Sequence, residues 1–306
     1  MPVVKSRALI SAVLLLVACV PKKTVKPATE AAAPVRVSTV EGFSTPESVL
    51  WDAEQQVWFV SNINGSPVAH DSNGFISRLD RDGKLDGLHF VQGGRSAALL
   101  NAPKGMAIAG DTLWVADIDA LRGFNRKTGA PVATIEFGAR ARFLNDVAIA
   151  SDGTVYITDT GVSFDDKGGV SHPGPDRIFA VKGRSISVAA EGAWLSGPNG
   201  IAWDPANSRF VVVPFLGTAL LGWKPGDAKA DTIGTGPGQQ DGVEIVGGET
   251  VVTSWTDSTL FAVGQGGNRR IASGVNSPAD IGVDPTRELV AIPLFLENKV
   301  EIWKLR

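Results

Sequence analysis

The stretch from Phe143 to Asp159 is a unit that this chain repeats. It reads Phe-Leu-Asn-Asp-Val-Ala-Ile-Ala-Ser-Asp-Gly-Thr-Val-Tyr-Ile-Thr-Asp, which is a polar pair, an apolar strand, an Asp-Gly turn and a second apolar strand. An Asp-Gly turn between two apolar runs predicts a tight antiparallel hairpin. A hairpin that recurs along the chain predicts an architecture of similar modules, each packed against its neighbours.

The pattern occurs six times. The other copies begin near residues 46, 103, 198, 240 and 278, and each is followed by a second strand. The central residues of the copies are Glu47, Lys104, Asn145, Asn199, Asp241 and Ala279, with spacings of 57, 41, 54, 42 and 38 residues. About forty residues per four-stranded unit is the period of a β-propeller. The sequence therefore predicts an all-β, six-bladed β-propeller of four-stranded antiparallel blades over residues 35–306.

The last unit supplies only three strands before Arg306. An alternating apolar segment, residues 35–40, is available at the other end of the propeller region. We expect this N-terminal strand to complete blade six from outside, because closing the ring removes both free strand edges.

Two copies carry long insertions after their second strands. One insertion spans residues 61–74 and contains His70; the other spans residues 159–175 and contains His172. In an up-and-down blade, this loop lies on the same face as the start of the first strand. The insertions are therefore expected to cover the mouth of the central channel, and long loops on one face of a regular scaffold are where function usually resides.

First strands line the channel, so the central residues of the copies should converge on its axis. Among them are two carboxylates, Glu47 and Asp241, and two carboxamides, Asn145 and Asn199. Such an all-oxygen set suits a hard divalent cation such as Ca²⁺. Alternatively, these residues only satisfy backbone groups around a wet channel, as Asx turns do.

Lys104 occupies the equivalent position in blade two. It could orient a substrate carbonyl or anion. It could instead pair with Glu47 or Asp241 and make a metal unnecessary, because a buried charge needs a partner.

Four of the repeats resemble a known family. The motifs are Pro-Glu-Ser-Val-Leu-Trp at 46–51, Leu-Asn-Asp-Val-Ala-Ile at 144–149, Pro-Asn-Gly-Ile-Ala-Trp at 198–203 and Asp-Gly-Val-Glu-Ile at 241–245. They are similar to the metal-binding repeats of the SMP-30/gluconolactonase/LRE-like propellers, which are related to paraoxonase, diisopropyl fluorophosphatase and strictosidine synthase. The resemblance covers residues 45–306.

The resemblance implies a calcium-dependent hydrolase of a small ester, with a sugar lactone as the expected substrate. It implies that Glu47, Asn199 and Asp241 bind the ion, and that Asn145 completes the metal shell or holds the substrate. Asp241 would also act as general base or nucleophile. Lys104 has no dependable counterpart in the family, and we assign it to substrate binding.

Two further residue types bear on the site. His70 and His172 are the candidate proton carriers, because histidine titrates near neutral pH. Tryptophans recur on the predicted strands and are expected to pack between blades; they are Trp51, Trp58, Trp114, Trp203, Trp223, Trp255 and Trp303.

A second function remains open from the sequence. Blade two, residues 102–117, is also similar to NHL repeats, which mostly bind other molecules without reacting with them. A non-catalytic binding propeller on a lipoprotein anchor is therefore the alternative. The formal net charge of −3, without a basic cluster, argues against a nucleic-acid partner. We expect a monomer with a small-molecule ligand.

The N-terminus has the features of an export signal. Lys5 and Arg7 precede an apolar run, and Leu16-Val17-Ala18-Cys19 resembles the lipobox of bacterial lipoproteins. Residues 1–19 are thus predicted to be a signal peptide with Cys19 as the lipidated residue, and residues 20–34 a flexible tether. The expected location is the periplasmic or cell-surface face of a membrane. Cys19 is the only cysteine, which excludes an internal disulfide.

Overall fold

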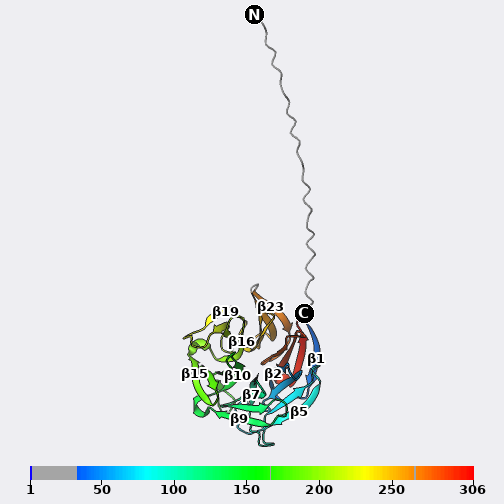
Figure 1. Cartoon of the computed structure of the whole chain (residues 1–306), viewed down its shortest axis with the longest axis vertical. Helices are drawn as coiled ribbons and strands as arrows, with labels where there is room; N and C mark the ends of the chain where they lie inside the picture. Colours follow the sequence, from blue (N-terminus) through cyan, green and yellow to red (C-terminus); the bar gives the residue numbers. More distant parts are fainter. Residues whose placement is uncertain (2–32, 166, 265–266) are drawn as a thin grey trace. The chain divides into compact units, whose positions relative to one another are not determined.

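The computed structural model describes residue 1 and residues 33–165, 167–264 and 267–306. Cys19 and most of the predicted tether lie outside these residues. From residue 33 onward the chain forms six four-stranded antiparallel sheets arranged around a common axis (Figure 1). The predicted six-bladed propeller is confirmed. No helix in the described part of the chain is long and apolar enough to cross a membrane.

Each blade is one sheet, in which the first strand lies nearest the axis and the following strands are added outward. The innermost strands are β2 (Pro46–Asp52), β6 (Pro103–Ala109), β10 (Leu144–Ile149), β16 (Pro198–Asp204), β20 (Gln240–Val246) and β24 (Gly282–Asp284). The second strands are β3 (Val57–Asn62), β7 (Thr112–Asp117), β11 (Val155–Asp159), β17 (Arg209–Pro214), β21 (Glu249–Ser254) and β25 (Leu289–Leu294).

The two outer positions complete each sheet. The third strands are β4 (Phe75–Leu79), β8 (Ala120–Asn125), β14 (Arg177–Lys182), β18 (Ala219–Trp223), β22 (Thr259–Gly264) and β26 (Lys299–Lys304). The outermost strands are β5 (Leu85–Gln92), β9 (Pro131–Glu136), β15 (Ser185–Glu191), β19 (Asp231–Thr235), β23 (Gly267–Ser273) and β1 (Val35–Glu41). The short elements are β12 (Ser163–Phe164), β13 (Val170–Ser171), and the 3₁₀ turns η1 (Gly138–Arg140), η2 (Ala193–Leu195) and η3 (Phe295–Glu297).

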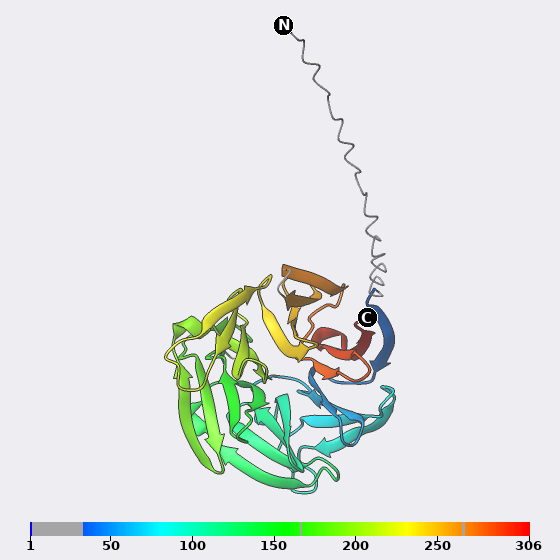
Figure 2. The same ribbon diagram turned by 45° about the horizontal axis from the view of Figure 1, so that its top comes forward.

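The ring closes as the sequence predicted. Strand β1 pairs antiparallel with β26, from Val35 opposite Lys304 to Glu41 opposite Lys299. Figure 2 shows β1, in blue, along the outside of the red C-terminal strands. The first and last segments of the propeller therefore share blade six, and the ring has no open edge there.

The cores lie between neighbouring blades. Trp58 and Val300 pack where blades six and one meet, and Tyr156, Phe210 and Trp223 pack between blades three and four. All five side chains are buried. The second strands are nearly continuous buried runs, as in β11 and β17. Successive side chains point to opposite faces, so such runs supply both faces of each sheet, and each face contacts an adjacent blade.

Candidate metal and substrate site

The start of the first strand carries a β-bulge in five of the blades. In β20, for example, Asp241 and Gly242 together face the single residue Thr253 of β21, because the pairing runs from Gln240–Ser254 to Val243–Val252. Equivalent register shifts occur at Glu47, Lys104, Asn145 and Asn199. A bulge turns a side chain away from the direction that the regular alternation of the strand would give it.

Hydroxyl groups on the second strands fill three of these bulges, those of blades one, three and five. In blade five the Thr253 hydroxyl accepts a hydrogen bond from the Gly242 N–H at 2.8 Å and donates to the Ala279 carbonyl of blade six at 3.0 Å. Thr158 acts in the same way between Asp146 and the Asn199 carbonyl. In these blades a backbone N–H freed by the bulge is therefore satisfied, and Thr158 and Thr253 also join their blades to the next one close to the axis.

Glycine permits the close approach of the first strands. A Cβ on Gly200 would lie 2.3 Å from the Asp241 carbonyl oxygen, and one on Gly242 would lie 2.6 Å from the Asp280 Cα. These contacts are shorter than any side chain allows, so only glycine fits. Packing of this kind brings residues from distant parts of the chain to the axis.

The bulged residues meet in one cavity of about 370 Å³. Five of the six predicted central residues line it: Glu47, Lys104, Asn145, Asn199 and Asp241. All five are buried. The sixth, Ala279, is not among the lining residues. The predicted convergence on the axis is confirmed, and these five residues are called the polar ring below.

A second ring lies farther out along the hairpins. Its members directly follow the second strands: Ile63, Thr160, Phe215, Trp255 and Phe295. In blade five Gln240 pairs with Ser254, so Trp255 extends one residue beyond the strand pair, whereas Asp241 lies one residue inside it. The same offset holds in blade one, where Pro46 pairs with Asn62. These five residues, called the outer ring, surround the entrance to the polar ring.

The two insertions also line the cavity. Pro67 comes from the first insertion, and Val162, Phe164 and Val170 come from the second. Phe164 packs against Phe143, with the ring centroids 5.5 Å apart. The prediction that both insertions cover the mouth is confirmed.

Glu47 and Asp241 are buried carboxyl groups without full hydrogen bonding. Glu47 Oε2 and Asp241 Oδ1 are both buried and have no partner. Burial raises the pKa of Glu47 well above its usual value, and the nearby Asp241 raises it further. Burial likewise raises the pKa of Asp241, and Asp280 adds to the effect. Unpaired buried carboxylates are costly, which indicates that a positive ligand or protons belong there.

Lys104 does not neutralise them through an ion pair. Its ammonium donates to the carbonyl oxygens of Ala102 at 3.0 Å and Pro67 at 3.3 Å, and it lies 4.4 Å from the centroid of the Phe143 ring. Among the residues that the structure describes, Lys104 forms no salt bridge with Glu47 or with Asp241. Burial lowers the pKa of Lys104 to about 8. No direct ion pair joins Lys104 to an axial carboxylate, but the charge of Glu47 acts on Lys104 through space and raises its pKa against the effect of burial.

The two carboxamides complete an oxygen donor set. The Asn145 amide N–H donates to the Thr160 hydroxyl at 3.1 Å, an assignment that leaves Asn145 Oδ1 free to accept or coordinate. The described residues contain no group of three His, Cys, Asp or Glu side chains arranged to hold a metal. A metal centre here would thus depend on both carboxamides. Two carboxylates with unpaired oxygens and two amide oxygens fit a hard divalent cation.

A smaller cavity of about 140 Å³ lies farther along the same first strands. Its lining includes the carboxyl groups of Asp146, Glu244 and Asp280. Burial raises the pKa of Glu244 to about 8 and that of Asp280 to about 7. Asp146 accepts from the N–H groups of Ile201 and Val147, both at 2.7 Å.

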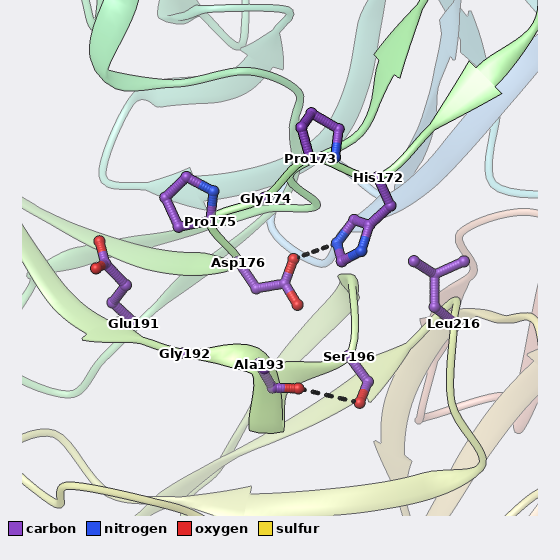
Figure 3. A pocket seen from close by; sticks show the side chains of 10 residues that line it. All are labelled: His172, Pro173, Gly174, Pro175, Asp176, Glu191, Gly192, Ala193, Ser196 and Leu216. Atoms are coloured by element: carbon purple, nitrogen blue, oxygen red, sulfur yellow. Dashed lines mark hydrogen bonds and ion pairs between the residues drawn. The ribbon is translucent and has the colours of Figure 1, made fainter.

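Neither predicted histidine lines the axial cavity. His70 is exposed, and its Nδ1 lies 3.4 Å from the Asn101 amide nitrogen. His172 lies in a separate surface pocket of about 530 Å³ (Figure 3). There its Nε2 is 2.5 Å from Asp176 Oδ1, and Asp176 Oδ2 accepts from the Gly197 N–H. The structure thus supplies no contact between either histidine and the polar ring.

Comparison with known proteins agrees with this architecture. The family model described as SMP-30/Gluconolactonase/LRE-like region matches residues 45–216, more than half of the chain. This chain belongs to that family. No curated protein matches its sequence.

Solved structures of similar fold are distant in sequence. A gluconolactonase from Xanthomonas campestris is 16% identical with a TM-score of 0.66, covering 92% of this chain and 99% of that one. A putative gluconolactonase is 15% identical with a TM-score of 0.64, covering 90% and 93%. A catalytically inactive virginiamycin B lyase from Staphylococcus aureus is 13% identical with a TM-score of 0.58, covering 89% and 98%. At these identities the likeness establishes the fold.

Sequence reasoning missed the outer ring. The expectation that Trp255 packs between blades is wrong, because its indole lines the cavity beside Phe215 and Phe295, with ring centroids 5.9 and 5.6 Å away. The signal was present in the repeat: all three residues occupy the position just after the second strand of their blades. Aligning that position across the copies would have found them.

Proposed function

We propose that this protein is a divalent-cation-dependent hydrolase of small esters, with lactones as the substrate class. The observation that carries the proposal is the polar ring, in which Glu47 Oε2 and Asp241 Oδ1 are buried without partners at the closed end of a ligand-sized cavity. Membership in the gluconolactonase-like family supports the same reaction class.

Glu47, Asn145, Asn199 and Asp241 would hold the cation, and Ca²⁺ is the ion to test first because all four side chains offer oxygen. A bound cation of this kind polarises a carbonyl and stabilises the oxyanion of ester hydrolysis. The remaining steps belong to the side chains themselves.

Hydrolysis breaks the acyl C–O bond and forms a bond between the acyl carbon and a water oxygen. The proton lost by the water is transferred to the departing alkoxide oxygen. Asp241 would carry it, because its carboxylate lines the cavity in which the ester is proposed to bind and can accept a proton and return it.

Lys104 would bind the substrate. An ammonium group has three N–H donors, and two of them are taken by the carbonyls of Ala102 and Pro67. The third can donate to the carbonyl oxygen of the ester or to the carboxylate of the product. The fixed position of Nζ makes Lys104 an orienting group.

The test is hydrolysis of a lactone panel by the purified protein with Ca²⁺, after exhaustive chelation, and after Ca²⁺ is restored. We expect turnover that chelation abolishes and Ca²⁺ recovers, and that Asp241→Asn loses. Activity that survives chelation unchanged would refute the metal requirement. Absence of both turnover and ion binding would favour the non-catalytic binding propeller.

We also propose that the protein is a lipid-anchored exported protein. The support is Lys5 and Arg7 before an apolar run that ends at Cys19. Intact-mass analysis should find a diacylglyceryl-modified Cys19 at the mature N-terminus, and Cys19→Ser should release the protein from membranes. An unmodified Cys19 in membrane-free protein would refute the anchor.

A further inference from the structure

The outer ring differs in chemistry from the polar ring that it surrounds. Four of its five members are apolar: Ile63, Phe215, Trp255 and Phe295. The fifth, Thr160, has its hydroxyl occupied, because it donates to the Pro198 carbonyl at 2.8 Å and accepts from the Asn145 amide. The Trp255 indole N–H is buried without a hydrogen-bond partner and acts on Asp241 in the polar ring. Apart from that one group, the described residues of this ring offer no free side-chain donor or acceptor to a ligand.

The aromatic members of the wall support one another. Trp255 lies between Phe215 and Phe295, with ring centroids 5.9 and 5.6 Å away, and Phe143 packs against Phe164. Aromatic groups held in this way form a pre-organised apolar surface. A ligand that binds against them gains free energy by removing apolar area from water.

The apolar surface continues to the solvent. Val170 and Leu216 line the cavity and are 62% and 51% exposed. A substituent of a ligand that extends from the polar ring toward the solvent would thus pass the aromatic side chains first and the aliphatic side chains of Val170 and Leu216 at the rim. A polyhydroxylated group in this position would lose several hydrogen bonds to water, and the single Trp255 N–H could replace only one of them.

We propose that the substrate is a lactone or ester whose ring or acyl carbon carries an extended alkyl or aryl substituent, and not a sugar lactone. The ester group would lie in the polar ring and the substituent along the outer ring. This inference rests on the proposed function and deepens it. It replaces the sugar lactone expected from the family resemblance.

The kinetic test compares glucono-δ-lactone, γ-butyrolactone and γ-lactones with linear side chains up to six carbons long. Burying a methylene group contributes enough to raise kcat/KM by about threefold to fourfold per carbon, until the wall is covered. Hydrolysis of glucono-δ-lactone with a higher kcat/KM than the alkyl lactones would overturn the inference and leave the hydrolase proposal intact. Failure to hydrolyse any member would refute the hydrolase proposal itself.

Two adjacent residues provide a matched pair of variants. Phe295 lines the cavity, whereas Leu296, the next residue of η3, is 72% exposed and does not. Phe295→Thr should lower the ratio of kcat/KM for the longest alkyl lactone to that for γ-butyrolactone about tenfold. Leu296→Thr should change this ratio less than twofold. Equal ratios in wild type and Phe295→Thr would contradict the assignment.

A binding measurement tests the inference without turnover. The corresponding alkyl lactam resists hydrolysis and should change the tryptophan fluorescence of the wild type, whereas Trp255→Phe should lose most of that change. The alkyl lactam should also bind at least tenfold more tightly than unsubstituted 2-pyrrolidinone. Equal affinity for both lactams would overturn the inference even if no lactone is hydrolysed.

Discussion

The two axial cavities contain the same kind of acid in different surroundings. In the larger cavity, Glu47 Oε2 and Asp241 Oδ1 have no hydrogen-bond partner. In the smaller one, Asp146 accepts two backbone N–H groups, and Asp280 accepts from the Ser48 hydroxyl at 2.5 Å. Both sets of carboxyl groups are buried with raised pKa values.

This difference separates a ligand site from a structural one. Backbone and hydroxyl donors can hold the acids of the smaller cavity, and protonation removes their remaining charge. The larger cavity adds two carboxamides, a fixed ammonium group and the volume for a small ligand. A set of unpaired oxygen donors in a cavity of this size suits binding of a cation and a substrate, so we assign chemistry to the larger cavity alone.

The sharpest test of the comparison uses two carboxyl groups on strand β20. Asp241→Asn removes a charge from the larger cavity, and Glu244→Gln removes one from the smaller. We expect Asp241→Asn to abolish Ca²⁺ binding in calorimetry and to lower kcat/KM about 10³-fold, since preorganised electrostatic groups contribute on this scale. Glu244→Gln should leave both within about threefold. If both variants lose the ion equally, the distinction between the cavities is wrong.

Acidification should weaken ion binding. Because the pKa values of Glu47 and Asp241 are raised, protons compete with the cation at these carboxyl groups as the pH falls through those values. Displacing two protons lowers the affinity by up to about 100-fold per pH unit. Calcium titrations between pH 8 and pH 5 check this, and an affinity independent of pH would contradict a site made from these two groups.

Lys104→Met should separate ion binding from substrate binding. Removing a buried positive charge near Glu47 should tighten Ca²⁺ binding severalfold, because like charges repel in a desolvated site. Loss of the orienting donor should lower kcat/KM by about 10- to 100-fold. Calorimetry and steady-state kinetics on the same preparation measure both effects; unchanged kinetics would remove Lys104 from the site.

The smaller cavity should affect stability in the metal-free protein. The folded-state pKa values of Asp280, about 7, and Glu244, about 8, exceed the value of about 4 of an unfolded carboxyl group. The folded state therefore retains protons that the unfolded state releases, so stability falls as the pH rises from 4 to 8.

Together the two raised pKa values imply a loss of about 6 kcal/mol between pH 5 and pH 8, so we expect the melting temperature of the metal-free protein to be about 10 °C higher at pH 5 than at pH 8. Glu244→Gln should reduce this difference. Above pH 8 the depressed pKa of Lys104 acts in the opposite direction, since stability then rises with pH. A melting temperature that increases steadily from pH 5 to pH 8 would contradict the assignment of these raised pKa values.

The smallest effect is expected at the surface pocket of Figure 3. His172 contacts Asp176 there and has no contact with the polar ring. His172→Ala should change kcat/KM less than about twofold. It should lower stability by only about 1 kcal/mol, because the buried Asp176 keeps the Gly197 N–H as a partner. A hundredfold loss of activity would restore the histidine as a proton carrier.

The repeat in the sequence was enough to predict the fold and the polar ring. One position per blade, seen at Glu47, Asn145, Asn199 and Asp241, is placed on the axis by topology alone. The bulge that aims each side chain was not visible, because it depends on pairing between strands. The contacts of Lys104 were equally hidden, since its ammonium group binds backbone carbonyls, one nearby at Ala102 and one in the first insertion at Pro67.

The outer ring illustrates a different limit. Trp255 and Phe295 look like core residues in the sequence because they directly follow apolar strands. Whether such a residue faces a neighbouring blade or the channel depends on how far its hairpin extends toward the mouth. The length of each hairpin at the mouth is known only from the strand pairing in the structure.

A crystal structure with Ca²⁺, using anomalous scattering to locate the ion, tests the central claim most directly. We predict one axial peak at about 2.3–2.6 Å from oxygens of Glu47, Asn145, Asn199 and Asp241. A peak among Asp146, Glu244 and Asp280 instead, or no axial peak at saturating Ca²⁺, would contradict it.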